Sequence, residues 1–381
     1  MKRTLRYFFV GVLTVFALLT VSARKHAQPA GRTVKLGVML PLHNINGDGR
    51  RMVEYYRGVL MACDSLRTLG ISVDVHAWNT PDDKDITPVL ADEDAQQCDI
   101  ILGPLYSKQM SQLSLFADRH DIRLVVPFSI NSPELATNRN IFQIYQSPYG
   151  FNESVIAKFM NQFQGYHPVI IDCNDTTSTK GIFTFGLRRK LEERNISYGL
   201  TSLKSSETNF ARAFSTTQPN VVILNTGRSP ELNVAIAKLN GLTATMPSLS
   251  ITLFGYTEWL MYTKYQLDNF YKYNTYIPAT FHYLPLMSKT LRLQQKYRWN
   301  FHQDMMQSLP RFALTGFDHT MFFVLGFANY GKNFTGAPGA LDYQPVQTPL
   351  KFERIRGGGL QNRSLTFVHY LPEHRTETIN F

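Results

Sequence analysis

Cysteine is scarce in this sequence, with three residues among 381. So few cysteines in a chain of this length exclude a disulfide-based scaffold, so we expect its stability to come from hydrophobic cores. Charged residues make up only 18% against 44% hydrophobic residues, which is a globular rather than a disordered composition. A length of 381 residues is enough for two domains of ordinary size.

The short motifs that mark common catalytic and metal sites are missing as well. There is no G-x-S-x-G hydrolase turn, H-E-x-x-H zinc helix, Walker loop or C-x-x-C pair. No two of the ten histidines are three or four residues apart, the spacing that places two ligands on one face of a helix. We therefore expect neither an enzyme nor a metal site, and no cofactor.

The net charge of +10 is not concentrated in any run of lysine and arginine. Three of these charges, on Lys2, Arg3 and Arg6, lie in the first 23 residues, which contain no acid, so the remainder carries +7. Without a basic stripe, we expect no nucleic-acid partner. A spread positive charge is typical of an ordinary basic protein, and it is also compatible with an anionic ligand or surface.

The N-terminus has the layout of a secretory signal. Its basic residues precede an uninterrupted apolar or small stretch, Tyr7 to Val21, and Val21-Ser22-Ala23 offers the small side chains that signal peptidase requires. This stretch of 15 residues is shorter than the roughly 20 that span a bilayer, with an uncleaved anchor as the alternative. We predict a signal peptide at 1–23, a linker at 24–33 and a periplasmic mature protein with no membrane span.

In an oxidising compartment the three cysteines can either form a disulfide or remain free thiols. Cys63 lies on the apolar side of a predicted helix, and Cys98 precedes a predicted buried strand. Either two of the three form a disulfide, or all of them, Cys173 included, are small buried hydrophobic residues.

Buried strands alternate with helices through most of the chain. The apolar run Val34 to Leu42 predicts a parallel strand covered on both faces, and spacings of three and four from Met52 to Leu66 predict a helix. Further strands are predicted at 72–78, 99–102, 124–128, 168–172, 221–225 and 250–254, with helices at 87–97, 107–120, 153–163, 181–194, 229–240, 288–307 and 313–329. The last 40 residues predict short strands with turns, one of them at 357–359. Two successive series of this kind predict an α/β protein with two doubly wound lobes, each built on a largely parallel sheet.

Two loops of the first lobe carry polar side chains at the carboxyl ends of strands, where open α/β sheets bind ligands. Gly103 to Ser107 follows the third strand and leads into a helix, so Ser107 is a candidate N-cap of a helix that can attract an anion. Pro127 to Leu135 follows the fourth strand and contains Ser129 and Asn131. Plain capping of the following turns is the alternative explanation for both loops.

Several short segments, in this order, resemble the type I periplasmic binding proteins, and among them the leucine/isoleucine/valine-binding branch. The matching segments span about residues 34 to 335 and are Leu40-Pro41-Leu42, Gly58 with Ala62, Ile101 to Pro104 with Ser107, Ser129 to Leu135, Phe254-Gly255 and Thr315 to Asp318. The resemblance implies two lobes joined by a three-strand hinge, with a ligand held in the cleft between them. It implies an N-terminal lobe of 34–146 and 278–335, and a C-terminal lobe of 147–277 and 336–381.

The resemblance assigns ligand contacts to the first lobe. Ser107 corresponds to the hydroxyl that holds the ligand carboxylate, and Ser129 and Asn131 correspond to contacts from the next loop. Arg51 falls where the family often has an aromatic or small residue, and it favours a more anionic ligand.

In the second lobe the resemblance points to the segment Gly255-Tyr256-Thr257-Glu258. Glu258 lies near the acid that pairs with the ligand ammonium in the family, offset by one residue, and Tyr256 is a further candidate contact. The family's aromatic contact in this lobe has no clear equivalent around 176–183.

Two functions of different classes follow from these features. The leading hypothesis is an exported solute-binding protein that captures an amino acid or related polar or anionic solute for an ABC-type transporter, whose permease is the partner. The alternative is a periplasmic sensor or scaffold that regulates cell-envelope (peptidoglycan) machinery through protein contacts. Residues 259–283 hold nine Tyr, Trp or Phe residues, which form either a partner surface or a lobe core.

Overall fold

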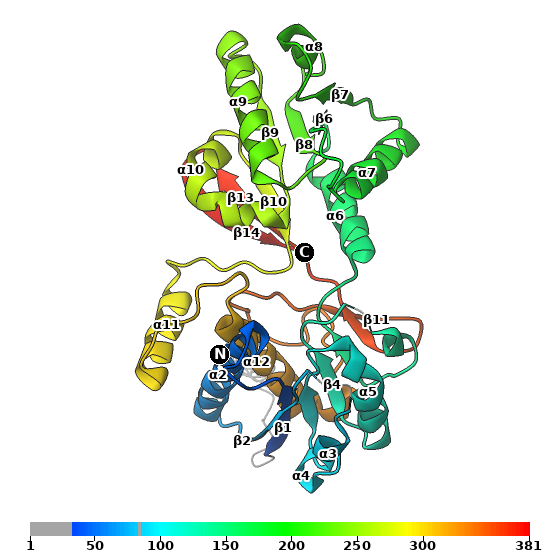
Figure 1. The fold of residues 1–381 in the computed structure, drawn as a ribbon, viewed down its shortest axis with the longest axis vertical. Coiled ribbons are helices and arrows are strands. Elements are labelled where there is room, and N and C mark those ends of the chain that lie inside the picture. The colour runs from blue at the N-terminus through cyan, green and yellow to red at the C-terminus, as the bar shows by residue number, and fades with distance from the viewer. Residues whose placement is uncertain (1–32, 83–84, 131) are drawn as a thin grey trace, which may run out of the picture.

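The structure is a computed structural model that describes residues 33–82, 85–130 and 132–381. Two lobes lie end to end, each built on a seven-stranded sheet flanked by helices (Figure 1). The predicted α/β fold with two doubly wound, largely parallel sheets is confirmed. The predicted signal peptide at 1–23 lies outside the described residues, as does all of the predicted linker except its last residue.

The first lobe has the strand order β11-β12-β5-β4-β3-β1-β2. All neighbours are parallel except the edge pair β11 and β12. The strands are β1 Val34–Leu40, β2 Val73–Asn79, β3 Ile100–Leu102, β4 Arg123–Val126, β5 Ile141–Gln143, β11 Phe352–Arg354 and β12 Leu360–Asn362. The helices are α2 Gly47–Thr68, α3 Thr87–Leu90, α4 Glu93–Gln96, α5 Met110–Arg119, α11 Ser288–Phe301 and α12 Phe312–Tyr330, with the 3-10 turns η1 Ser107–Gln109, η2 Pro133–Ala136 and η4 Gly331–Asn333.

The second lobe has the strand order β14-β13-β10-β9-β8-β6-β7. Strands β6 to β10 are paired in parallel, whereas β13 is antiparallel to both of its neighbours, β10 and β14. The strands are β6 His167–Asp172, β7 Gly199–Ser202, β8 Asn220–Leu224, β9 Ile251–Phe254, β10 Tyr276–Ala279, β13 Thr366–Leu371 and β14 Arg375–Asn380. The helices are α6 Pro148–Gln162, α7 Gly181–Glu193, α8 Glu207–Ala211, α9 Ser229–Thr245 and α10 Thr263–Lys272, with the 3-10 turn η3 Thr257–Tyr262.

Three segments, 144–147, 280–287 and 363–365, cross between the lobes. The third crossing corrects the prediction that 336–381 belongs to the C-terminal lobe. Strands β11 and β12 extend the first sheet beside β5, and only β13 and β14 join the second sheet. Sequence patterns could not place these strands, because the partner of a short strand is decided by contacts distant in the chain.

Other differences from the predicted elements have local causes. The helix expected at 87–97 is divided into α3 and α4, because Asp92 leaves the helical conformation and caps α4 with its side chain. The helix expected at 288–307 ends at Phe301, where His302 adopts a left-handed φ of 53°. Strands β5, β7 and β10, each of three or four residues, were not predicted.

Helices α2 and α12 make a very close crossing that depends on two glycines. A Cβ on Gly58 would lie 1.9 Å from the carbonyl oxygen of Ala313, and one on Gly316 would lie 2.1 Å from that of Tyr55. Both glycines belong to segments that carry the family resemblance. Their missing side chains let the α2 and α12 backbones pack in direct contact.

The aromatic stretch 259–283 lies mainly in the core of the second lobe. Trp259 and Phe270 are fully buried, and Tyr273 and Tyr276 are also buried. The three cysteines are free thiols, as the second alternative expects, although Cys63 is only half-buried. In the described part of the chain, no helix has the length and apolar character needed to cross a bilayer.

Candidate functional site

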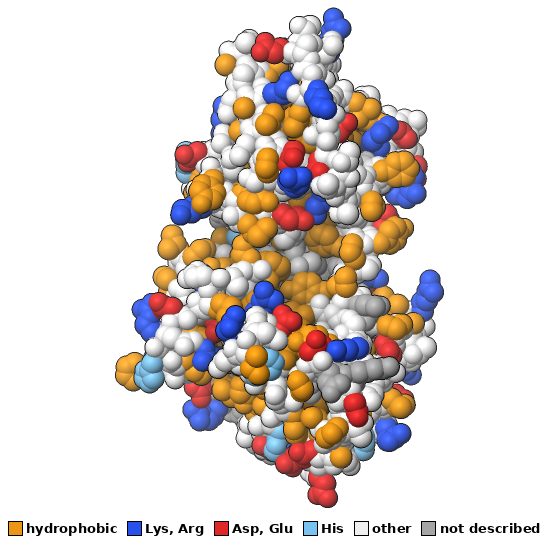
Figure 2. Space-filling model, viewed as in Figure 1, with side chains coloured by type: hydrophobic (Ala, Val, Ile, Leu, Met, Phe, Trp, Pro, Cys, Tyr) orange, Lys and Arg blue, Asp and Glu red, His pale blue; other side chains and the backbone are white. Residues whose placement is uncertain are grey.

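A cavity of about 560 Å³ lies between the lobes. Its walls come from the loops after β4, β5, β6, β9 and β10, which are all at the carboxyl ends of their strands. Figure 2 shows hydrophobic side chains gathered at this narrow waist of the molecule. The volume is typical of a small-molecule site, and its place matches the ligand sites of doubly wound sheets.

On the first lobe, the structure brings two predicted site residues together. The Oγ atoms of Ser107 and Ser129 are 2.8 Å apart and form a hydrogen bond between the loops after β3 and β4. The predicted N-cap role of Ser107 is wrong, because Tyr106 takes the N-cap position of η1 and α5 begins only at Met110. Asn131, the third residue predicted here, lies outside the described residues.

Arg51 lies in the second turn of α2, next to the switch point between β1 and β3. Its Nη1 atom is 3.1 Å from Oδ1 of Asp48, and about half of each side chain is exposed. The hydroxyl of Tyr106 donates to the other oxygen of Asp48 at 3.5 Å. Arg51 does not line the interlobe cavity, and its charge is paired within its own helix.

On the second lobe, Glu258 and Tyr256 both line the cavity, and Glu258 has a partner there. The Nζ atom of Lys180 is 2.6 Å from Oε1 of Glu258 and 4.9 Å from the centre of the Tyr256 ring. The ring itself is buried, and its hydroxyl donates to the carbonyl oxygen of Leu224. Burial raises the pKa of Tyr256 well above its usual value, so its hydroxyl is a donor at any physiological pH.

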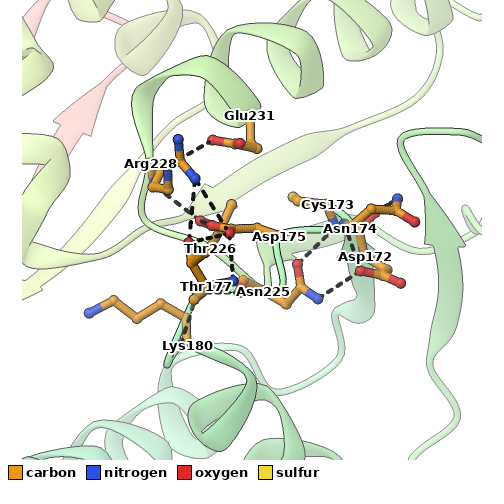
Figure 3. Close-up of polar contacts among 11 residues, drawn as sticks. Asp172, Cys173, Asn174, Asp175, Thr177, Lys180, Asn225, Thr226, Arg228 and Glu231 are labelled. Carbon is orange, nitrogen blue, oxygen red and sulfur yellow. Dashed lines mark hydrogen bonds and ion pairs between the residues drawn. The ribbon is translucent and has the colours of Figure 1, made fainter.

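Behind this pair, a network of hydrogen bonds links the loops after β6 and β8 (Figure 3). The Asn225 amide donates to Asp172 at 2.8 Å, and the Thr226 hydroxyl donates to Asp175 at 2.8 Å. Hydrogen bonds from Thr177 and Thr226 hold the pKa of the Asp175 carboxyl at about 2. The network gives the loop that carries Lys180 a defined conformation at the switch point between β6 and β8.

Sequence reasoning missed Lys180 and the apolar walls around it. The cavity is lined by exposed Tyr149 and Ile182 and by buried Phe183, while Ile130 faces it from the first lobe. The loop before α7 follows a predicted strand, so the rule that led to the other loops could have selected it. The contact between Lys180 and Glu258 joins two separate βα units and carries no sequence signal.

Another cavity, of about 710 Å³, lies between α8 and α9 at the far end of the second lobe (Figure 1). It is remote from the carboxyl ends of the strands, so the interlobe cavity is the better candidate site. Over the described residues, no group of three or more His, Cys, Asp or Glu side chains is placed to hold a metal ion.

Comparison with known proteins finds likeness only in structure. No protein-family model and no curated protein sequence matches the chain. A branched-chain amino acid ABC transporter protein from Rhodospirillum rubrum superposes with a TM-score of 0.59 at 15% identity, over 91% of this chain and 100% of that one. A branched-chain amino acid ABC transporter periplasmic ligand-binding protein from Burkholderia xenovorans LB400 gives 0.54 at 11% identity, over 91% and 94%.

LpoA from Haemophilus influenzae is similar to the same extent. Its TM-score is 0.58 at 13% identity, over 92% of this chain but only 59% of LpoA. These structures define the class: the chain has the type I periplasmic-binding-protein fold that the sequence resemblance predicted. At such low identities the likeness establishes the fold alone.

Proposed function

We propose that the chain is an exported, non-enzymatic solute-binding protein that captures a small polar or anionic solute, such as an amino acid or a relative of one, for an ABC-type transporter. The observation that carries this proposal is the interlobe cavity, whose wall comes from both lobes and from two crossover segments. Such a cavity changes shape whenever the lobes move. A solute bound there is therefore coupled to lobe closure.

The polar groups are divided between the lobes in a way that suits this mechanism. Lys180 and Glu258 offer a donor and an acceptor in the cavity wall of the second lobe, and Ser107 and Ser129 offer hydroxyls on the first lobe outside that wall. A ligand that contacts both sets is bound best when the lobes are closed, so it shifts the population towards the closed form. The segments 144–147, 280–287 and 363–365 are the hinges of this movement.

A thermal-shift screen tests the proposal. Protein from Arg24 onward, refolded to remove any bound solute, is heated with amino acids, short peptides and small carboxylic acids. A ligand at 100 times its Kd stabilises the native state by about 2.7 kcal/mol, which raises the Tm measurably. A hit should also lower the radius of gyration in X-ray scattering. A hit without this compaction would contradict the closure mechanism.

The second candidate function is a periplasmic scaffold that acts on cell-envelope machinery through protein contacts. It is favoured by exposed apolar side chains on α11 and the crossover before it, where Trp299 is 82% exposed and Leu286 is 86% exposed. Exposed apolar groups of this size are typical of contact surfaces. A screen without any hit would remove the solute-binding proposal and leave this candidate.

A further inference from the structure

Glu258, the acid expected to pair with a ligand ammonium, already pairs with the side-chain ammonium of Lys180. Lys180 Nζ contacts Oε1 of Glu258 at 2.6 Å, and both residues line the interlobe cavity. The other oxygen, Oε2, is buried and has no hydrogen-bond partner among the described residues. The Gly227 backbone lies against the pair, since a Cβ there would be 3.4 Å from both Oε2 and the Lys180 side chain.

The neighbouring acids cannot take over this role. Asp175, on the loop after β6, and Glu231, in the first turn of α9, both pair with Arg228, at 3.5 and 3.7 Å. Asp175 also accepts hydrogen bonds from two threonine hydroxyls. A ligand ammonium entering this face would meet acids whose charge is already compensated.

Lys180 competes for Glu258 more effectively than a free ligand ammonium, because it is covalently part of the chain. Because the lysine is part of the same lobe, its effective concentration at Glu258 is on the order of millimolar or more. A ligand ammonium would have to displace it and would then lie beside a second positive charge in a partly buried site. An uncharged group in the same place neither displaces the lysine nor sets a second positive charge beside it.

We propose that Lys180 determines specificity in the interlobe site, by neutralising Glu258 from within the chain and selecting acids that lack a free ammonium over the matching amino acids. This inference rests on the proposed function. The ligand class is a small carboxylate with an aliphatic or aromatic body. Its apolar body lies on Tyr149 and Ile182, which are 69% and 65% exposed in the cavity wall. Ser107 and Ser129 lie outside this wall on the first lobe, so their hydroxyls reach the ligand carboxylate only when the lobes close.

Calorimetric titration with two matched pairs of solutes tests the inference. The pairs are 4-methylpentanoate with L-leucine, and 3-phenylpropanoate with L-phenylalanine, which differ only in the α-ammonium. We expect the wild-type chain to bind the acid of at least one pair ten or more times more tightly than the amino acid. In Lys180→Met, which keeps the length of the side chain, Glu258 is released and the preference should reverse.

Two controls separate this effect from a general loss of charge or of folding. Lys190→Met removes a lysine of α7 that pairs with Glu193 at 2.6 Å and does not line the cavity, and it should keep the wild-type preference. Adding Glu258→Gln to Lys180→Met should abolish the gain in amino-acid binding. Lys180→Gln provides a second variant if the methionine variant does not fold.

The outcomes distinguish the inference from the proposed function. If the wild type binds the amino acid as tightly as the acid, or if Lys180→Met leaves the ratio unchanged, the inference is wrong while solute binding stands. If neither member of either pair binds, and the wider screen is also without a hit, the proposed function fails and the inference fails with it.

Discussion

The Oγ atoms of Ser107 and Ser129 lie 2.8 Å apart, although 22 positions separate the two residues in the chain. The contact joins the loops after β3 and β4 at the edge of the first sheet that faces the second lobe. One of the two hydroxyls donates to the other, so the pair keeps one proton with which to donate to a ligand carboxylate.

Replacement of Ser107 by alanine should weaken the binding of a carboxylate ligand about tenfold, because one hydrogen bond to a charged group is lost. Calorimetric titration with a hit from the screen measures the change. Ser111→Ala, an exposed serine of α5, is the matched control and should leave Kd unaltered. Equal affinities for all three proteins would show that Ser107 does not contact the ligand.

Gly58→Ala should lower the free energy of unfolding by roughly 1–3 kcal/mol, because the new Cβ collides with the Ala313 carbonyl and forces α2 and α12 apart. Gly241→Ala is the control. It lies in α9 with no neighbouring atom within 4 Å of the added Cβ, and it should stabilise the chain by up to about 1 kcal/mol. Urea denaturation of the two variants measures both effects, and a loss at Gly241 with none at Gly58 would refute the packing argument.

Asp318→Ala should cost about 3 kcal/mol or more, since the buried carboxylate accepts hydrogen bonds from three successive backbone N–H groups, 346–348, and from the Tyr343 hydroxyl. The same loop receives the N–H of His282 from the crossover 280–287. Asp304→Ala removes an exposed carboxylate and should change stability by less than about 0.5 kcal/mol. Denaturant unfolding that gives the same small value for both variants would exclude this role.

Stability should fall as the pH drops below about 6.5, the usual pKa of histidine in an unfolded chain. Burial lowers the pKa of His319 to about 3, so between these values the unfolded chain binds a proton that the folded chain does not. The free energy of unfolding then decreases by up to about 1.4 kcal/mol per pH unit for this group.

His319→Gln should remove this part of the slope between pH 6 and pH 4.5, measured by urea unfolding at each pH. His302→Gln changes an exposed histidine and should keep the slope. The same pH dependence in wild type and His319→Gln would mean that His319 is not the group responsible.

The chain's periodic patterns were enough to predict two doubly wound lobes, because buried parallel strands and amphipathic helices are local features of composition. Ser107 and Ser129 could also be selected from the sequence, since each follows a predicted strand and such loops converge at one edge of a parallel sheet. The short strands β5, β7 and β10 were not predicted, and their places in the sheets follow from pairing with strands distant in the chain.

Two features were decided only by the tertiary structure. The hairpin β11–β12 returns to the first sheet beside β5, a pairing across more than half of the chain that no local pattern encodes. Lys180 meets Glu258 because two separate βα units place their loops side by side, and only that contact shows that the acid is already neutralised. The sequence by itself therefore determined the fold class and where the lobes would face one another. The charge balance inside the cleft depends on side-chain distances of a few ångströms, which arise only when both units pack into one sheet.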